Sequence, residues 1–186
     1  MPTLFYTIQV EFQDVRVQFQ DWPPLKPNFP FGQLPVLEVD GEMIGQSVAI
    51  ANHLAREFDL YGKTNMEKCR IDQVVGIIQD FIQSGVKVMF EKDEAKKAEL
   101  KKVNEEEEFP RYLGFLEKFL QKNGNGYFVG SGFTLADIFV YDTAYNALKR
   151  VPTAIDKFPL LKAHYNKVGA LPQIKAYVDA RKPSDF

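Results

Sequence analysis

The stretch from Phe31 to Ile50 places the strongest limits on how this chain can fold. It holds a short apolar run after Pro35, the dipeptide Asp40-Gly41, a second short apolar run, and then apolar residues at helical spacing that begin near Ser47. An Asp-Gly pair between two apolar runs is a strong signal for a two-residue hairpin turn. The stretch therefore predicts two antiparallel strands followed directly by a helix.

The same stretch indicates a binding site that is built mainly from backbone groups. Leu34 can offer its N–H and C=O to an extended peptide, and a cis bond before Pro35 would turn Leu34 outward. Ser47 lies beside the free N–H groups of a helix start, which together with the helix dipole favour a carboxylate. We expect this segment to capture a small peptide-like anion.

Length and composition exclude several classes of protein. A chain of 186 residues is long enough for one large domain or two small ones with a real core. Its 23 basic and 25 acidic residues indicate no nucleic-acid partner. We expect no membrane span, because no apolar run is long enough, and no signal peptide. The one cysteine, Cys69, excludes a disulfide within the chain and favours a reducing, cytoplasmic setting.

The first 30 residues are harder to interpret. Apolar residues alternate with polar ones from Phe12 to Phe19, and this pattern predicts a strand over about 12–19. Residues 4–8 are too few to classify and could form a short strand or the last turn of a helix. Residues 21–30 include four prolines and predict a loop with at most one helical turn.

The remainder of the chain reads as helices. No strand signal of weight follows residue 65, so we expect an α/β domain over 1–60 and an all-helical domain of five or six helices over 66–186. Thr134-Leu-Ala-Asp137 has the spacing of a capping box and predicts a helix start with Thr134 and Asp137 in structural roles. Shorter helices are expected over about 159–168 and 172–181.

Several reactive side chains have simpler interpretations. The first long helix carries an apolar stripe, on which we expect Cys69 to lie in the core. His53 and His164 have no metal-ligand spacing and are expected to be structural, so no metal site is predicted. Glu105 to Glu108 are expected to begin a solvated helix. The stripe on the first long helix consists of Met66, Cys69, Val74, Ile77, Ile78 and Phe81.

The order of these motifs resembles the glutathione transferases, and most closely the sigma class of nematodes and of haematopoietic prostaglandin D synthase. The resemblance covers the chain from about Leu4 to Phe186. It implies an incomplete thioredoxin-like N-terminal domain followed by an all-helical C-terminal domain. The motifs that carry it are Trp22-Pro, Lys26, Phe31-Gly-Gln-Leu-Pro-Val-Leu, Asp40-Gly41, Gln46-Ser47, and Thr134-Leu-Ala-Asp137.

Carried over residue by residue, the resemblance implies a glutathione site. Leu34, which precedes the family's cis-proline at Pro35, would bond the cysteinyl backbone of glutathione. Gln46 and Ser47 would hold its γ-glutamyl carboxylate. The glycine end would be held by Trp22, Lys26 and Gln33. Asp80 stands where a family carboxylate reaches across a homodimer to the ligand's ammonium group.

The start of the chain departs from the family pattern. Leu4 to Phe12 resemble the end of the family's first helix running into its second strand, so the strand with the catalytic Tyr is not found. Tyr6 would then be a helix residue, and the alternative is that residues 2–8 occupy the missing strand's place with Tyr6 near the site. A strand over 12–19 would also lack its usual neighbour in the sheet.

The resemblance implies a cytoplasmic, dimeric glutathione transferase that conjugates glutathione, its co-substrate, to hydrophobic electrophiles in detoxification. Nematode relatives also suggest binding of haem and other flat apolar ligands, with no cofactor bound permanently. The alternative is a non-catalytic protein that binds glutathione or hydrophobic ligands. A free thiol has a pKa of about 8.5, so without the Tyr hydroxyl we expect attack on an electrophile to be slow at neutral pH.

Overall fold

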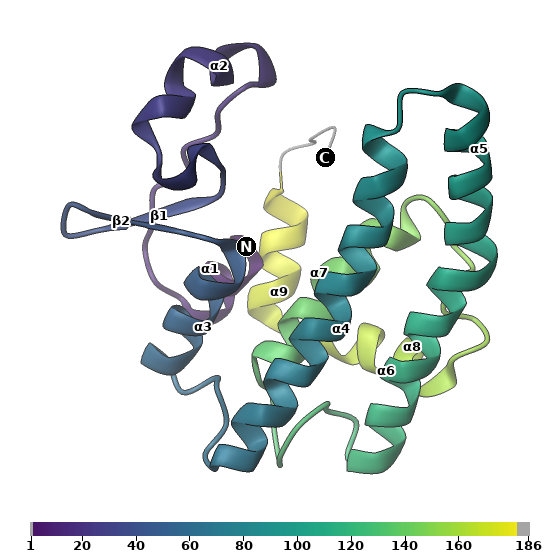
Figure 1. Ribbon diagram of the computed structural model, residues 1–186. Helices are drawn as coiled ribbons and strands as arrows, with labels where there is room; N and C mark the ends of the chain where they lie inside the picture. The colour runs from purple at the N-terminus through teal and green to yellow at the C-terminus, as the bar shows by residue number, and fades with distance from the viewer. Residues whose placement is uncertain (1, 182–186) are drawn as a thin grey trace. The chain divides into compact units, whose positions relative to one another are not determined.

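The computed structural model describes residues 2–181, which form two compact units. The first combines residues 2–61 with residues 172–181, and the second is Gly62–Leu171. The last helix joins the first unit because α9 (Pro172–Ala180) packs against α1 (Pro2–Ile8), as Figure 1 shows. The division into domains of 1–60 and 66–186 stays a prediction.

The first unit holds a two-stranded sheet and short helices. Its chain turns through brief 3₁₀ segments at Phe19–Asp21, Lys26–Asn28 and Pro30–Gly32. Its other elements are α1, α2 (Trp22–Leu25), β1 (Val36–Val39), β2 (Glu42–Gly45), α3 (Ser47–Glu57) and α9.

The predicted hairpin is confirmed. β1 pairs antiparallel with β2, with Val36 opposite Gly45 and Val39 opposite Glu42. Asp40 and Gly41 have φ values of 51° and 83°, and two consecutive positive φ angles are typical of the turns that join twisted hairpin strands. The peptide bond between Leu34 and Pro35 is cis.

The strand predicted over 12–19 is wrong. Residues 10–18 form neither helix nor strand, and Val15 and Phe19 leave 72% and 82% of their surface exposed. In the described chain the sheet contains only β1 and β2. Alternation shows which side chains could share a face, but a strand also needs a neighbour to bond its N–H and C=O groups. Residues 2–8 form a helix, one of the two possibilities open from the sequence.

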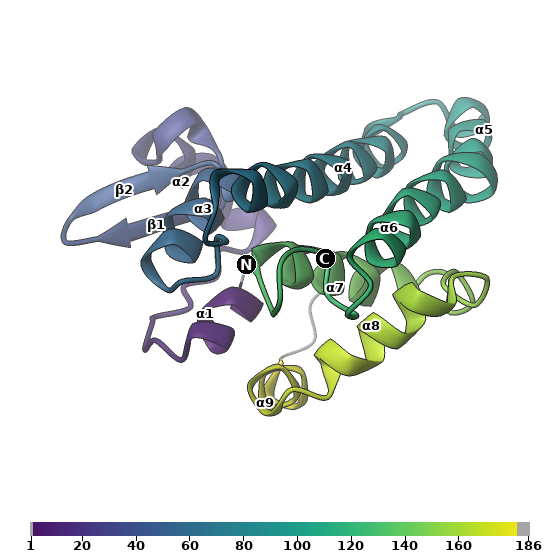
Figure 2. The ribbon, with the colours of Figure 1, turned by 90° about the horizontal axis from the view of Figure 1, so that it is seen from below.

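The second unit is helical. Its long α4 runs beside α6 and α7, and Figure 2 shows α4 and α6 side by side. Glu105 to Glu108 lie in a π-helical segment, Asn104–Glu108, and not at a plain helix start. The helices are α4 (Asn65–Phe90), α5 (Glu94–Val103), α6 (Phe109–Asn123), α7 (Leu135–Leu148) and α8 (Pro159–Gly169).

The prediction that Cys69 lies in the core is wrong, because its thiol is exposed. The buried face of α4 is made by Ile71, Val74, Val75 and Ile78, which follow a helical repeat of their own. Cys69 is two positions, or about 200° of helical rotation, from Ile71 and therefore lies on the far side of the helix. The sequence has apolar residues on both sides of α4, so spacing alone could not choose the buried face.

The start of α7 contains the predicted capping box between Thr134 and Asp137. The Asp137 carboxylate is fully buried and accepts hydrogen bonds from the Thr134 N–H at 2.8 Å, the Thr134 hydroxyl at 2.9 Å and the Phe128 N–H at 3.1 Å. His164 of α8 lies with Nε2 2.9 Å from the same carboxylate. The histidine therefore joins α8 to the start of α7, which is a structural role.

Candidate functional site

The predicted site residues of the first unit lie on a loop, the hairpin and the start of α3. The loop at Pro30–Gly32 leads into Gln33 and Leu34, and β2 leads into Gln46 and Ser47. The two segments meet at a hydrogen bond that Gln46 Nε2 donates to Gln33 Oε1, with 3.3 Å between the two atoms. Both amides are exposed, so their remaining polar atoms face solvent or a ligand.

Two glycines allow close contacts that shape this loop. A Cβ on Gly32 would lie 3.1 Å from Lys26 Cε and 3.2 Å from Lys26 Cγ, so the lysine stem lies against the glycine backbone. Gly32 also has a φ of +55°, a conformation that glycine adopts at little cost. A Cβ on Gly45 would lie only 2.9 Å from the ring of Phe31. Glycine at these positions therefore lets Lys26 and Phe31 pack directly on the backbone.

The start of α3 presents backbone donors. Gln46 precedes the helix with φ 69° and makes no capping hydrogen bond through its side chain, while its C=O accepts the Ile50 N–H at 3.0 Å. Ser47 is the first helical residue and is half-buried. N–H groups in the first turn have no acceptor within the helix, so they and the positive end of the dipole favour an anion. A positive φ on a non-glycine residue is a form of strain that often accompanies binding sites.

A groove lies beside these residues. It has a volume of about 370 Å³ and is lined by Val17, Phe19, Trp22, Gly32, Gln33 and Leu34. Trp22 also packs on Phe29, with 5.4 Å between ring centroids. The sequence predicts Trp22, Gln33 and Leu34 as residues of the glutathione site, but it does not predict that Val17 and Phe19 lie beside them. The alternation from Phe12 to Phe19 predicts a strand, and no sequence signal indicates a groove.

Tyr6 lies in an aromatic cluster on α1. Its ring is 4.7 Å from that of Tyr177 on α9 and 5.7 Å from that of Phe12, measured between centroids. Arg16 is near this cluster, and its pKa is raised chiefly by a hydrogen bond to Asp14. The Tyr6 side chain is thus packed among rings and is 39% exposed.

Asp80 belongs to the second unit, where it lies exposed on α4. The predicted role of Asp80 at a partner's ligand stays a prediction.

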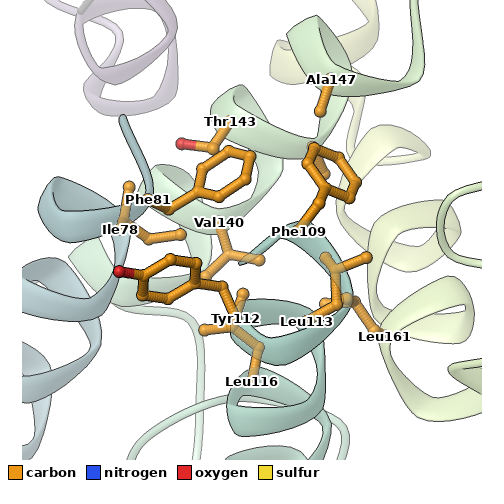
Figure 3. Close-up of a pocket in the computed structure, with 11 residues that line it drawn as sticks. Ile78, Phe81, Phe109, Tyr112, Leu113, Leu116, Val140, Thr143, Ala147 and Leu161 are labelled. Atoms are coloured by element: carbon orange, nitrogen blue, oxygen red, sulfur yellow. The ribbon is translucent and has the colours of Figure 1, made fainter. Parts of the chain in front are cut away.

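The second unit contains a small apolar cavity between α4, α6 and α7. Figure 3 shows Phe81, Phe109 and Tyr112 around it. Its volume of about 20 Å³ is close to that of a single water molecule. This cavity is therefore too small to hold an organic ligand.

Two further features concern the part of the chain that the structure describes. None of its helices is long and apolar enough to cross a membrane. Within residues 2–181, no group of three or more His, Cys, Asp or Glu side chains is arranged to hold a metal ion.

Comparison with known proteins identifies the family. Residues 3–56 match the family model "Glutathione S-transferase, N-terminal domain", and residues 79–181 match "Glutathione S-transferase, C-terminal domain". Glutathione S-transferase 4 of Caenorhabditis elegans is 38% identical over 187 residues, covering 97% of this chain and 89% of the relative.

Solved structures agree. The prostaglandin synthase D of Nilaparvata lugens has a TM-score of 0.92 at 33% identity and covers 98% of this chain and 92% of its own. The monomeric Na-GST-3 is a glutathione S-transferase of the hookworm Necator americanus. It matches with a TM-score of 0.88 at 34% identity, and the match covers 100% of this chain and 92% of that structure's chain. With its hairpin, capped helices and two matched domains, this chain belongs to the glutathione S-transferase family.

Proposed function

We propose that the first unit binds glutathione and that the protein is a weak glutathione transferase. The observation that carries this proposal is the contact between Gln33 and Gln46, which joins the loop at Leu34 to the open N-terminus of α3. Leu34 would bond the cysteinyl backbone beside Pro35, while Gln46 and Ser47 hold the γ-glutamyl carboxylate. Trp22, Lys26 and Gln33 would hold the glycine end, with the Lys26 ammonium opposite its carboxylate.

In the proposed reaction, the glutathione sulfur attacks a hydrophobic electrophile such as an aryl halide. A carbon–sulfur bond forms, the carbon–halogen bond breaks, halide leaves, and the thiol proton passes to solvent. A thiol with a pKa of about 8.5 is about 1% ionised at pH 6.5, so an unassisted site reacts slowly. Tyr6 is a weak candidate for assistance, because its ring packs between Phe12 and Tyr177.

A second candidate is a non-catalytic carrier of glutathione or of apolar ligands such as haem. Two observations favour it. The described residues before Val36 contain no strand from which a tyrosine could be presented, and Tyr6 sits in an aromatic cluster. A glutathione carrier would share its binding residues with the transferase and would differ from it only in whether the sulfur is activated.

We also propose a cytoplasmic location and a homodimer in which Asp80 reaches the partner's ligand. The single cysteine, which allows no disulfide within the chain, supports the location. Membership of a largely dimeric family supports the dimer.

Two assays on one preparation test the proposal. Calorimetry measures glutathione binding, and absorbance at pH 6.5 follows conjugation of 1-chloro-2,4-dinitrobenzene. We expect binding together with a rate that is low but above buffer. Binding without any rate above buffer would contradict the transferase and leave the carrier. Absence of binding would contradict both the transferase and a carrier of glutathione, and would leave only a carrier of apolar ligands.

A further inference from the structure

The groove beside the proposed glutathione site is larger and more apolar than a glycine residue requires. Trp22 and Gln33, which would hold the glycine end, line it together with Val17 and Phe19. Glycine has no side chain, yet the groove measures about 370 Å³, within the range of small-ligand sites. A ligand that ends in glycine would leave this apolar wall in contact with water.

The wall itself is open to a ligand. Phe19 is 82% exposed, Leu34 is 45% exposed, and Val17 is half-buried. Covering apolar surface of this kind is favourable, and aromatic side chains bury the most area per residue. The Lys26 stem, held against Gly32 at the same groove, can keep its ammonium near a C-terminal carboxylate.

We propose that the groove makes the site selective for γ-glutamyl-cysteinyl tripeptides whose third residue is large and apolar, with the side chain against Val17 and Phe19. The inference rests on the proposed function, because it assumes that the glycine end of glutathione lies at Trp22, Lys26 and Gln33. The third side chain would lie in the groove while the carboxylate stays at Lys26 and the γ-glutamyl end stays at α3.

Binding in the groove can be followed by intrinsic fluorescence, because Trp22 is the single tryptophan of the chain and lines the groove. Fluorescence titrations of the full chain would compare glutathione with γ-glutamyl-cysteinyl-phenylalanine. We expect the phenylalanine tripeptide to bind about tenfold tighter, which corresponds to ~1.4 kcal/mol.

Substitutions at Val15, Val17 and Phe19 distinguish residues that line the groove from a neighbour that does not. Val17→Ala and Phe19→Ala should each remove most of the preference while changing glutathione affinity less than about twofold. Val15→Ala is the matched control, because Val15 is two residues from Val17, is 72% exposed and does not line the groove. It should change neither affinity.

S-benzylglutathione carries a benzyl group on its sulfur, whereas γ-glutamyl-cysteinyl-phenylalanine carries it on the third residue. It is therefore the control for which end of the ligand lies in the groove. Its affinity should be unaffected by Val17→Ala, and a loss would assign the groove to the sulfur end and overturn the inference. Glutathione binding without a preference for the phenylalanine tripeptide would also overturn it, with the proposed function intact. Absence of binding by both tripeptides would overturn the proposed function and this inference together.

Discussion

Two glycines, Gly32 and Gly45, determine where charged and aromatic side chains can lie in the candidate site. Gly32 lets the Lys26 stem approach within about 3 Å of where a Cβ would stand, and Gly45 does the same for the Phe31 ring. Because Gly32 also has a positive φ, a substitution there would be strained as well as crowded. The placement of Lys26 thus depends on the backbone beneath it.

The charge of Lys26 can be tested by substitution. Lys26→Gln should weaken glutathione binding by only about 0.2–1 kcal/mol, because Lys26 is exposed and exposed ion pairs are weak. The loss should disappear at 1 M salt, where the Debye length is about 3 Å. Calorimetry at low and high salt checks this. A loss that is the same at both salt concentrations would mean that Lys26 does not act as a charge.

Some residues of the candidate site could be brought together from the sequence and others could not. Leu34, Gln46 and Ser47 belong to local motifs in which a turn and a helix start define the geometry. Val17 and Phe19 reach the groove only through the fold of the loop, and their alternation indicated a strand. His164 meets Asp137 across 27 positions of chain, and no spacing rule connects them.

Helix starts and the hairpin could be predicted because their sequence signals are local. The strand over 12–19 was not, since strand formation depends on a partner that the pattern does not include. The π-helical segment Asn104–Glu108 was also missed. It ends two residues before Pro110, whose missing N–H breaks the regular helical hydrogen-bond pattern.

Two capping boxes allow a matched comparison of helix starts. Thr64→Ala at the exposed start of α4 should reduce the free energy of unfolding by about 1 kcal/mol. Thr134→Ala should cost about 2 kcal/mol or more, because its hydroxyl donates to the buried Asp137 carboxylate. Urea unfolding of both variants measures the difference. An equal cost would show that burial adds nothing at Thr134.

The start of α4 also predicts a pH effect. The Glu67 carboxylate accepts hydrogen bonds from the backbone N–H groups of Lys63 and Thr64, and these lower its pKa from the ordinary value of 4.5, with the larger effect from Lys63. A lowered pKa in the folded state adds stability above the unfolded value, and this stability is lost as pH falls through the folded value. Glu67→Gln should therefore lose less stability than the wild type between pH 6 and pH 3.5. Urea midpoints at both pH values test this, and parallel declines would contradict it.

Membership of the family leads us to expect that the complete protein self-associates. One structural relative, from Necator americanus, is monomeric, so the family alone does not decide the matter. We expect sedimentation equilibrium to give twice the 21.3 kDa mass of one chain. A single-chain mass would remove Asp80 from the site, because its proposed role needs a partner's ligand.

We propose that the start of α3 holds the γ-glutamyl end of glutathione, and a substitution of Ser47 tests this proposal. Calorimetry should show that Ser47→Ala lowers glutathione affinity by ~1.5–3 kcal/mol, the range for hydrogen bonds to charged groups. Ser131→Ala, in an exposed loop of the second unit, is the control and should leave the affinity unchanged. An affinity of the Ser47→Ala variant equal to that of the wild type would contradict the proposed site.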